Sequence, residues 1–335
     1  MDPMLYLLAF VIFLTLIFDF INGFHDSANA IATVVSTRVL SPLIAVVYAG
    51  VLNFIGALMG TEVAATIGSG LVGSDVITLH TILCTVLAAI IWNLITWYKG
   101  LPTSSSHAII GALLGAAFFS SAAGHDNIHW DKLLHKVIYP MLASPVIGIV
   151  LGFIIMTLLT WLICRMRPQR VSKVFGKLQI VSAGFMAITH GLNDAQKSMG
   201  IIALALVVAF PHEAFHVPLW VKLACALAMG AGTMLGGWRI IHTLGSKMIK
   251  LQPVHGFAAE TTAAIIIGGA SHFGIPVSTT QVITTAIMGV GSTKRLSAVR
   301  WGVVGNIVWA WVLTIPTTFI LSGLLMLAYK TLFLS

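Results

Sequence analysis

Charged residues are scarce in this sequence. Asp, Glu, Lys and Arg make up 8% of its 335 residues, whereas they supply roughly a quarter of a soluble domain. Hydrophobic residues make up 58%, and the mean hydropathy is +0.99. A water-soluble fold could not cover so much apolar surface with so few charges. We therefore expect an integral membrane protein.

Two further shortages exclude other classes of protein. The chain has three cysteines, Cys84, Cys164 and Cys225, which are too widely spaced for a metal motif or a disulfide framework. Strand-length segments of alternating apolar and polar residues are lacking, which argues against an outer-membrane barrel. The N-terminus has neither a basic region nor a cleavage site after its apolar stretch. We therefore expect Met4–Ile21 to be a retained span and not a signal peptide.

Basic residues exceed acidic residues, 18 to 10, which gives a net charge of +8. They lie in short loops between apolar segments, as the positive-inside rule predicts, and do not suggest a nucleic-acid partner. A bilayer-spanning helix needs about 20 apolar residues. The apolar segments cover residues 4–37, 41–60, 80–98, 102–120, 137–163, 178–209, 220–236, 253–273, 276–291 and 301–328.

These segments predict an all-α membrane protein of ten crossings, in which short segments rich in Gly, Ser and Pro form re-entrant hairpins. If the N-terminus is outside, the C-terminus is outside too, and most Lys and Arg residues fall inside, as expected for a multi-pass protein of the plasma membrane. The inside residues are Arg38, Lys99, Arg165, Arg167, Arg170, Lys173, Lys177, Arg239, Lys247, Lys250, Lys294, Arg295 and Arg300.

The segment Arg165–Lys177 carries five positive residues and no negative residue, and it divides the chain into two halves of five crossings. We predict a first repeat over residues 1–163, a basic cytoplasmic linker over 164–177, and a second repeat over 178–335. Because five is odd, the second half enters the membrane in the opposite sense. Homologous halves would therefore form an inverted repeat.

Three pairs of motifs indicate that the halves are homologous. Asn22–Asn29 (NGFHDSAN) matches His190–Lys197 (HGLNDAQK), so that Asp26 and Asp194 occupy equivalent positions. The segments GLPTSSSH at 100–107 and GIPVSTTQ at 274–281 share a glycine, a proline and a run of hydroxyl residues. The Gly-xxx-Gly pairs at 56–60 and 232–236 are more typical of helix packing than of a functional site.

The paired motifs predict sites for a cation and an anion. An aspartate inside a membrane span is costly and is usually paired, ion-bound or in contact with water. Interruption of the spans by Gly and Asn near Asp26 and Asp194 predicts discontinuous helices that bind hard cations. Pro102 and Pro276 suit the first turn of a helix, where hydroxyls and free N–H groups would bind a tetrahedral oxyanion. Alternatively, such hydroxyls bond to their own helix and aid packing.

At these residues the chain resembles the inorganic phosphate transporter (PiT) family, whose duplicated motif is approximately Gly-x-Asn-Asp-x-x-Asn-Ala. Here it reads Gly23–Ala30 (GFHDSANA) and Gly191–Ser198 (GLNDAQKS), and the segments Ala259–Ala263 and Asn306–Pro316 are also similar to the family. The resemblance implies a cation-coupled symporter that imports inorganic phosphate by alternating access, either as the free anion or as a metal–phosphate complex.

Two positions depart from the family motif and bear on the coupling ion. His25 replaces the usual Asn, and Lys197 replaces the Asn of many sodium-coupled members. The sequence Asn-Asp-x-Gln-Lys is similar to that of members thought to be proton-coupled, so we favour protons over sodium as the coupling ion. The resemblance and the motifs together predict phosphate-binding residues Ser104, Ser105, Ser106, Ser278, Thr279, Thr280, Gln196 and Gln281. They predict cation-coupling residues Asp26, Asn29, Asn193, Asp194, Lys197 and Glu260.

Several alternatives stay open at this point. A sulfate permease of the same fold is the nearest one, and an anion channel would lack concentrative uptake. A hydrolase with Ser104 or Ser106 as nucleophile and His107 as base is disfavoured, because Gln281 stands at the position equivalent to His107. We therefore expect no enzyme and no cofactor, and we assign no resident metal. Expected partners are phosphate, the coupling proton or sodium ion, membrane lipid and a second copy in a homodimer.

Overall fold

The structure is a computed structural model that describes residues 3–72, 77–120, 128–212 and 214–333. Within these ranges the secondary structure is helical, apart from one isolated antiparallel bridge between Val72 and Ile128. The helical elements of the first half are α1 (Pro3–Ser36), α2 (Pro42–Ala57), α3 (Glu62–Gly70), α4 (Leu79–Lys99), α5 (Ser105–Ser120), α6 (Trp130–Leu133), the π-helical turn η3 (Leu134–Ile138) and α7 (Tyr139–Ile163).

The second half repeats this order of elements. It contains α8 (Pro168–Ala209), α9 (Leu219–Leu235), α10 (Trp238–His242), the π-helical turn η4 (Thr243–Lys247), α11 (Pro253–His272), α12 (Thr279–Ser292), the short 3-10 helix η5 (Leu296–Ala298) and α13 (Trp301–Phe333). Each apolar segment predicted from the sequence corresponds to one helix. The short helices α3 and α10 were not predicted, because each lies beyond a break in the apolar pattern.

Not every predicted crossing is an independent span. Among the described residues, five helices are long and apolar enough to cross a membrane: α1, α4, the continuous stretch Trp130–Ile163, α8 and α13. The pairs α2–α3 and α9–α10 bend by 71° and 59°, and each would add one broken span. Helices α5 and α12 have 16 and 14 residues, fewer than the roughly 20 needed to cross. They form hairpins with α4 and α11, which agrees with the predicted re-entrant segments.

Helix packing follows the duplication. Helix α1 packs on α9 as α8 packs on α2, and α5 packs on α13 as α12 packs on α7. The hairpins also share their turn, since Gly100 and Gly274 both adopt a φ of 65°. This left-handed conformation is costly for a residue with a Cβ atom. The equivalent positions therefore require glycine for the same reason in both halves.

The Gly-xxx-Gly pairs lie where helices of opposite halves cross closely. A methyl group on Gly56 would lie 2.0 Å from the Ile188 carbonyl oxygen of α8. A methyl group on Gly232 would lie 2.1 Å from the Phe20 carbonyl oxygen of α1. Small residues let helix backbones approach in this way. The packing interpretation is therefore correct for Gly56 and Gly232, whereas Gly60 and Gly236 have side chains as their nearest neighbours.

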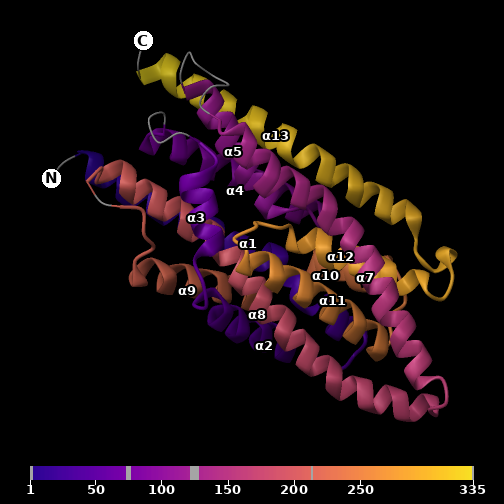
Figure 1. Ribbon diagram of the computed structural model, residues 1–335. Helices are drawn as coiled ribbons and strands as arrows, with labels where there is room; N and C mark the ends of the chain where they lie inside the picture. Colours follow the sequence, from indigo (N-terminus) through magenta and orange to yellow (C-terminus); the bar gives the residue numbers. More distant parts are fainter. Residues whose placement is uncertain (1–2, 73–76, 121–127, 213, 334–335) are drawn as a thin grey trace.

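Helix α7 runs along the bundle in one direction, and α8 and α13 run in the opposite direction (Figure 1). The start of α1 and the end of α13 lie at the same end of the bundle, and the connection from α7 to α8 lies at the opposite end. This connection is shorter than predicted, because only residues 164–167 separate the two helices. The other ten residues of the predicted linker form the first turns of α8, since Pro168 suits the start of a helix and the following Arg and Lys residues favour helix formation.

Candidate substrate and cation site

The matched aspartates meet at the centre of the fold. Asp26 on α1 and Asp194 on α8 are 2% and 0% exposed. One ligand atom from each, together with one from His190, lies within a group whose members are all within 4.8 Å of one another. The structure therefore brings together the two carboxylates that the inverted repeat places at equivalent positions.

The helices that carry these aspartates are continuous, which corrects the prediction of broken helices at the motifs. Helix α1 runs through residues 22–29 and α8 runs through residues 190–197 without a break. A single glycine costs a helix only about 1 kcal/mol, and close packing against α9 and α2 compensates for that cost. The breaks lie instead in the neighbouring pairs α2–α3 and α9–α10.

Asp26 lies beside a histidine and a threonine hydroxyl. The Nδ1 atom of His25 lies 2.7 Å from Asp26 Oδ1, and the Thr280 hydroxyl donates to the same oxygen over 3.3 Å. The other ring nitrogen of His25, Nε2, lies 3.1 Å from the hydroxyl oxygen of Thr96 on α4. The imidazole thus links the first carboxylate to the hairpin of the first half.

Asp194 is paired with a lysine. The ammonium group of Lys197 donates to Asp194 Oδ1, as the spacing of three residues on one helix predicted. His190 Nε2 lies 3.1 Å from Asp194 Oδ2, and the Thr279 hydroxyl donates to the same oxygen over 3.0 Å. Lys197 is fully buried. The lysine is therefore held beside the second carboxylate by burial and by this contact.

The predicted asparagines have different surroundings. Asn29 on α1 donates to the hydroxyl oxygens of Thr279 and Thr280 over 3.2 and 2.9 Å, and so it joins the central cluster. Asn193 donates instead to the Ser271 hydroxyl of α11 over 2.8 Å. Its amide group thus contacts the end of α11 and not the carboxylate pair.

The two hydroxyl motifs form helix N-termini that meet. The backbone N–H of His107 donates to the Ser104 hydroxyl oxygen over 3.2 Å, and that of Gln281 donates to Ser278 over 3.2 Å. These are equivalent N-caps of α5 and α12. The Ser106 hydroxyl donates to the carbonyl of Val277 over 3.2 Å, which places the start of α5 against the residue that precedes the α12 cap.

The remaining predicted phosphate ligands differ in their contacts. Ser105 accepts a hydrogen bond from Asn93 of α4 over 3.2 Å. Thr279 and Thr280 donate to the carboxylates, so these two hydroxyls connect the anion motif to the cation motif. Gln196 accepts from the backbone N–H of Val63 over 2.7 Å at the start of α3.

Two buried amide atoms of the predicted phosphate ligands have no hydrogen-bond partner among the described residues. They are Gln196 Nε2 and Gln281 Oε1. An unpartnered buried polar atom costs free energy. Gln196 Nε2 is therefore a donor that a bound anion could use.

Glu260 lies apart from the aspartates. It accepts hydrogen bonds from Thr33 of α1 and from Gln179 and Ser182 of α8, with a distance of 3.0 Å for Gln179. Thr33 is seven residues along α1 from Asp26, which corresponds to about 10 Å of helix. Glu260 therefore belongs to a separate polar cluster toward the C-terminal end of α1.

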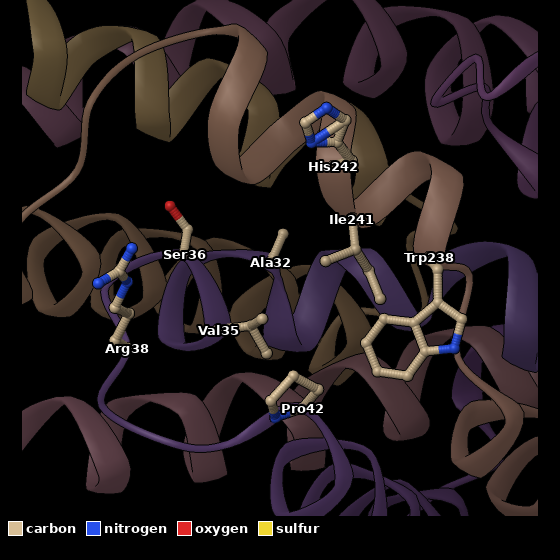
Figure 2. Close-up of a pocket in the computed structure, with 8 residues that line it drawn as sticks. All are labelled: Ala32, Val35, Ser36, Arg38, Pro42, Trp238, Ile241 and His242. Atoms are coloured by element: carbon tan, nitrogen blue, oxygen red, sulfur yellow. The ribbon is translucent and has the colours of Figure 1, made fainter.

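A cavity of about 470 Å³ opens at this end of α1. It is lined from α1 by Ala32, Val35 and Ser36, and Figure 2 shows these side chains between α10 and the start of α2. Arg38 and His242 also line it. Ala32 is one helical turn from Asn29, so the cavity approaches the central cluster from the side that carries Glu260.

Sequence reasoning did not identify several residues of these clusters as functional. His190 stands at the first position of its motif, where the first half has Asn22, and this position could have drawn attention to it. Gln179 and Ser182 precede the motif by more than two helical turns, so no spacing pointed to them. Their role as donors to Glu260 depends on how α11 packs against α8.

The cluster of Asp26, His190 and Asp194 is the place where this fold could hold a metal. Two carboxylates and an imidazole are suitable ligands for several divalent cations. The Lys197 ammonium, however, already contacts Asp194. Its charge opposes a divalent ion there and favours a proton or a monovalent cation at the neighbouring Asp26.

The chain is similar throughout its length to known proteins. A family model described as "Phosphate transporter family" matches residues 22–170 and again residues 164–322, once in each half. A protein of Rhizobium meliloti (strain 1021), named "Probable low-affinity inorganic phosphate transporter", is 48% identical over 320 residues, which cover 95% of each chain. A Bacillus subtilis (strain 168) protein of the same name is also 48% identical, over 94% of this chain and 95% of its own.

A solved structure, "The sodium-dependent phosphate transporter", has a TM-score of 0.89 at 24% identity and covers 98% of this chain and 100% of its own. At that identity the likeness shows the fold alone. The matching family model, repeated in both halves, confirms the resemblance seen in the motifs and places the protein among transporters and not enzymes. The chain belongs to the phosphate transporter family.

Proposed function

We propose that this phosphate transporter is a symporter that imports inorganic phosphate by alternating access, with protons favoured over sodium as the coupling ion. One observation carries the choice of ion. The buried Lys197 ammonium pairs with Asp194, while the equivalent position in the first half holds the neutral Asn29. The Lys197 ammonium neutralises the Asp194 carboxylate, as a bound cation would otherwise do. Asp26 is then the carboxylate that binds the exchangeable ion.

The proposed phosphate site lies where the N-termini of α5 and α12 meet. Helix N-termini present free N–H groups and a positive dipole end to an anion. Hydroxyl and amide donors add hydrogen bonds without the very tight binding of a buried arginine pair, and a carrier must release its substrate. The proposed ligands are Ser104, Ser105, Ser106, Ser278, Thr279, Thr280, Gln196 and Gln281.

Most of the proposed coupling residues lie beside this site, whereas Asn193 and Glu260 contact other residues. Thr279 donates to Asp194 and Thr280 donates to Asp26, so a change in charge at either carboxylate alters the orientation of one phosphate donor. This contact supplies a physical link between cation binding and anion binding. The proposed coupling residues are Asp26, Asn29, Asn193, Asp194, Lys197 and Glu260.

The arrangement in the membrane follows from the charge distribution. We propose a multi-pass protein of the plasma membrane with both termini outside, the repeats spanning residues 1–163 and 178–335, and the basic segment 164–177 inside. Thirteen of the 18 Lys and Arg residues then fall inside, which supports this orientation. The proposed partners are membrane lipid and a second copy in a homodimer.

Purified protein in liposomes tests the proposal. Phosphate uptake is measured with an imposed inward proton gradient in sodium-free buffer, with an inward sodium gradient at equal pH, and with neither gradient. The proton gradient should drive accumulation above equilibrium. Strict dependence on sodium, with no response to the proton gradient, would overturn the choice of ion.

The same assay separates the other candidates. Sulfate replaces phosphate in one arm, and uptake of sulfate at the rate of phosphate would favour the sulfate permease. Accumulation above equilibrium excludes an anion channel, since a channel only dissipates a gradient. Magnesium is present or chelated in a further arm, and uptake that requires it would show that the metal–phosphate complex is the transported form.

A further inference from the structure

A third aspartate, Asp19, lies in the core of the fold and has no part in the proposed mechanism so far. It precedes Asp26 by seven residues, two turns of α1, and therefore lies on the same face of that helix. Its exposed fraction is 0%. The Ser198 hydroxyl and the Cys225 thiol lie beside it, but neither carboxylate oxygen makes a hydrogen bond of good distance and angle among the described residues.

The neighbours of Asp19 are also unsatisfied. Asn22, one turn further along α1, is fully buried, and both polar atoms of its amide group lack partners among the described residues. Ser198 of α8 interacts with Asp19, and its buried hydroxyl likewise makes no hydrogen bond within the described chain. Asp19 thus lies beside the Ser198 hydroxyl and one turn of α1 from Asn22, whose amide oxygen has no partner within the described chain.

The charges around Asp19 do not balance. From α8, Lys197 and Asp194 act on it electrostatically, and from α9 the thiol of Cys225 faces it. The Lys197 ammonium is already hydrogen-bonded to Asp194. Among the described residues, Asp26 and Asp194 each have a histidine neighbour and Asp194 also has Lys197, whereas no ion pair is formed by Asp19. A buried carboxylate without an ionic partner binds a proton or another cation.

The position of Asp19 along α1 mirrors that of the Glu260 cluster. Asp19 lies seven residues before Asp26, and Thr33, which donates to Glu260, lies seven residues after it. At about 1.5 Å per residue, each step is about 10 Å. The cavity in Figure 2 approaches the Glu260 side, so Asp19 lies on the other side of the central cluster.

We propose that Asp19 is a second cation-binding carboxylate, which holds one monovalent cation on the N-terminal side of the central cluster with Asn22 and Ser198 as further oxygen ligands. The proposal rests on the proposed function, because the cation bound here is one that travels with phosphate. Both a proton and a sodium ion fit an oxygen-rich site of a single negative charge. The position equivalent to Asp19 in the second half is Ala187, so the site exists in one half only.

The test measures how many cations move with each phosphate. Wild-type protein and Asp19→Asn are reconstituted in liposomes, and the gradient at which net phosphate flux stops gives the ratio of cation to phosphate. One arm varies the proton gradient without sodium, and the other varies the sodium gradient at constant pH. Asp19→Asn should lower the ratio by one in one of the arms, and that arm identifies the ion. An unchanged ratio in both arms would overturn the proposal.

Two further variants keep the test decisive. Asp19→Glu retains a carboxylate and should retain the wild-type ratio. If Asp19→Asn fails to fold or carries no phosphate flux, the proposal is tested with Ser198→Ala instead. We expect it to raise the half-saturating proton or sodium concentration at least threefold, and an unchanged value overturns the proposal. Wild-type protein without gradient-driven uptake would refute the proposed function instead.

Discussion

The two halves of the central site share the helix packing and the aspartate, but they differ in the charged residues around that aspartate. In the first half, Asp26 is contacted by a histidine and a threonine hydroxyl. In the second half, Asp194 is contacted by a lysine ammonium, a histidine and a threonine hydroxyl. The backbone and the carboxylates are duplicated, but the fixed positive charge is not.

This difference shows how a duplicated pair of carboxylates can take on two tasks. A carboxylate that is paired with a buried ammonium cannot bind and release a cation easily, and loss of either partner leaves an uncompensated buried charge. A buried carboxylate that lacks such a partner is stabilised when it binds a proton or a cation from solution. The proposed function accordingly places the exchangeable ion in the first half, and each variant below changes one side of the comparison.

Loss of either central carboxylate should have the largest effect. Asp26→Asn and Asp194→Asn are both expected to abolish uptake of radioactive phosphate by liposomes. Asp194→Asn should also lower the free energy of unfolding by about 3–5 kcal/mol, because it leaves the buried Lys197 charge without a partner. Asp26→Asn removes no such pair and should unfold at a temperature closer to that of the wild type.

The control for this pair is the double variant Asp194→Asn with Lys197→Gln. It removes both charges and should recover part of the lost thermal stability, as measured on protein purified in detergent. Normal uptake by either single Asn variant would remove that aspartate from the site.

Introduction of a second lysine should have the next largest effect. Asn29→Lys places an ammonium near Asp26 and Thr280, so both halves would carry a fixed charge and the first half could no longer take up a mobile ion. We expect uptake to fall at least about tenfold, a change of about 1.4 kcal/mol in the activation free energy. Asn29→Gln, which keeps the amide donor, is the matched control. Wild-type uptake by Asn29→Lys would contradict the assignment of the exchangeable ion.

Neutralisation of Glu260 tests the acid outside the central pair. Thr33 donates to Oε1 of Glu260 and Ser182 donates to Oε2, so Glu260→Gln keeps one of these two acceptor oxygens and removes the charge. Uptake should lose its response to the imposed ion gradient, and the free energy of unfolding should fall by only about 1–3 kcal/mol. A variant that keeps the full gradient dependence would make Glu260 a structural hydrogen-bond acceptor.

The paired helix caps should give the smallest effects, and these should be equal. Ser104→Ala and Ser278→Ala each remove one N-cap, worth about 1 kcal/mol, and one proposed phosphate donor. Each should raise the KM for phosphate about fivefold in initial-rate measurements, which corresponds to about 1 kcal/mol of binding free energy. Ser120→Ala, at the far end of α5, is the control. A change of KM in only one of the two variants would show that the two motifs do not share the anion.

Much of the fold could be predicted because a helix that crosses a membrane needs an apolar segment of about 20 residues, which is visible in the sequence. The ten apolar segments correspond to ten helices, and the duplicated Asp, Pro and Gly positions indicated the repeat. The continuity of α1 and α8 could not be predicted from the sequence, because Gly23 and Gly191 are typical of a helix break. Only the structure shows that they pack closely against α9 and α2. The length of the basic linker was overestimated for a related reason, as a charged stretch can be helical.

The site was predicted where its residues belong to one motif, and it was missed where they do not. The contact of Lys197 with Asp194 follows from their spacing on one helix. The contacts of Thr279 and Thr280 with the carboxylates join residues 85 and 254 positions apart, and nothing in the local pattern indicates them. Helix packing alone brings three further residues to their partners, namely Gln179, Ser182 and Asp19.

The most direct test of the account is the ion dependence of Lys197→Asn beside that of the wild type. This substitution makes the second half match Asn29 of the first half. Phosphate uptake into liposomes is measured with a proton gradient alone and with a sodium gradient alone. We expect the wild type to respond to protons without sodium, and Lys197→Asn to lose that response and to require sodium. A wild type that depends strictly on sodium, or a variant whose proton response is unchanged, would contradict the account.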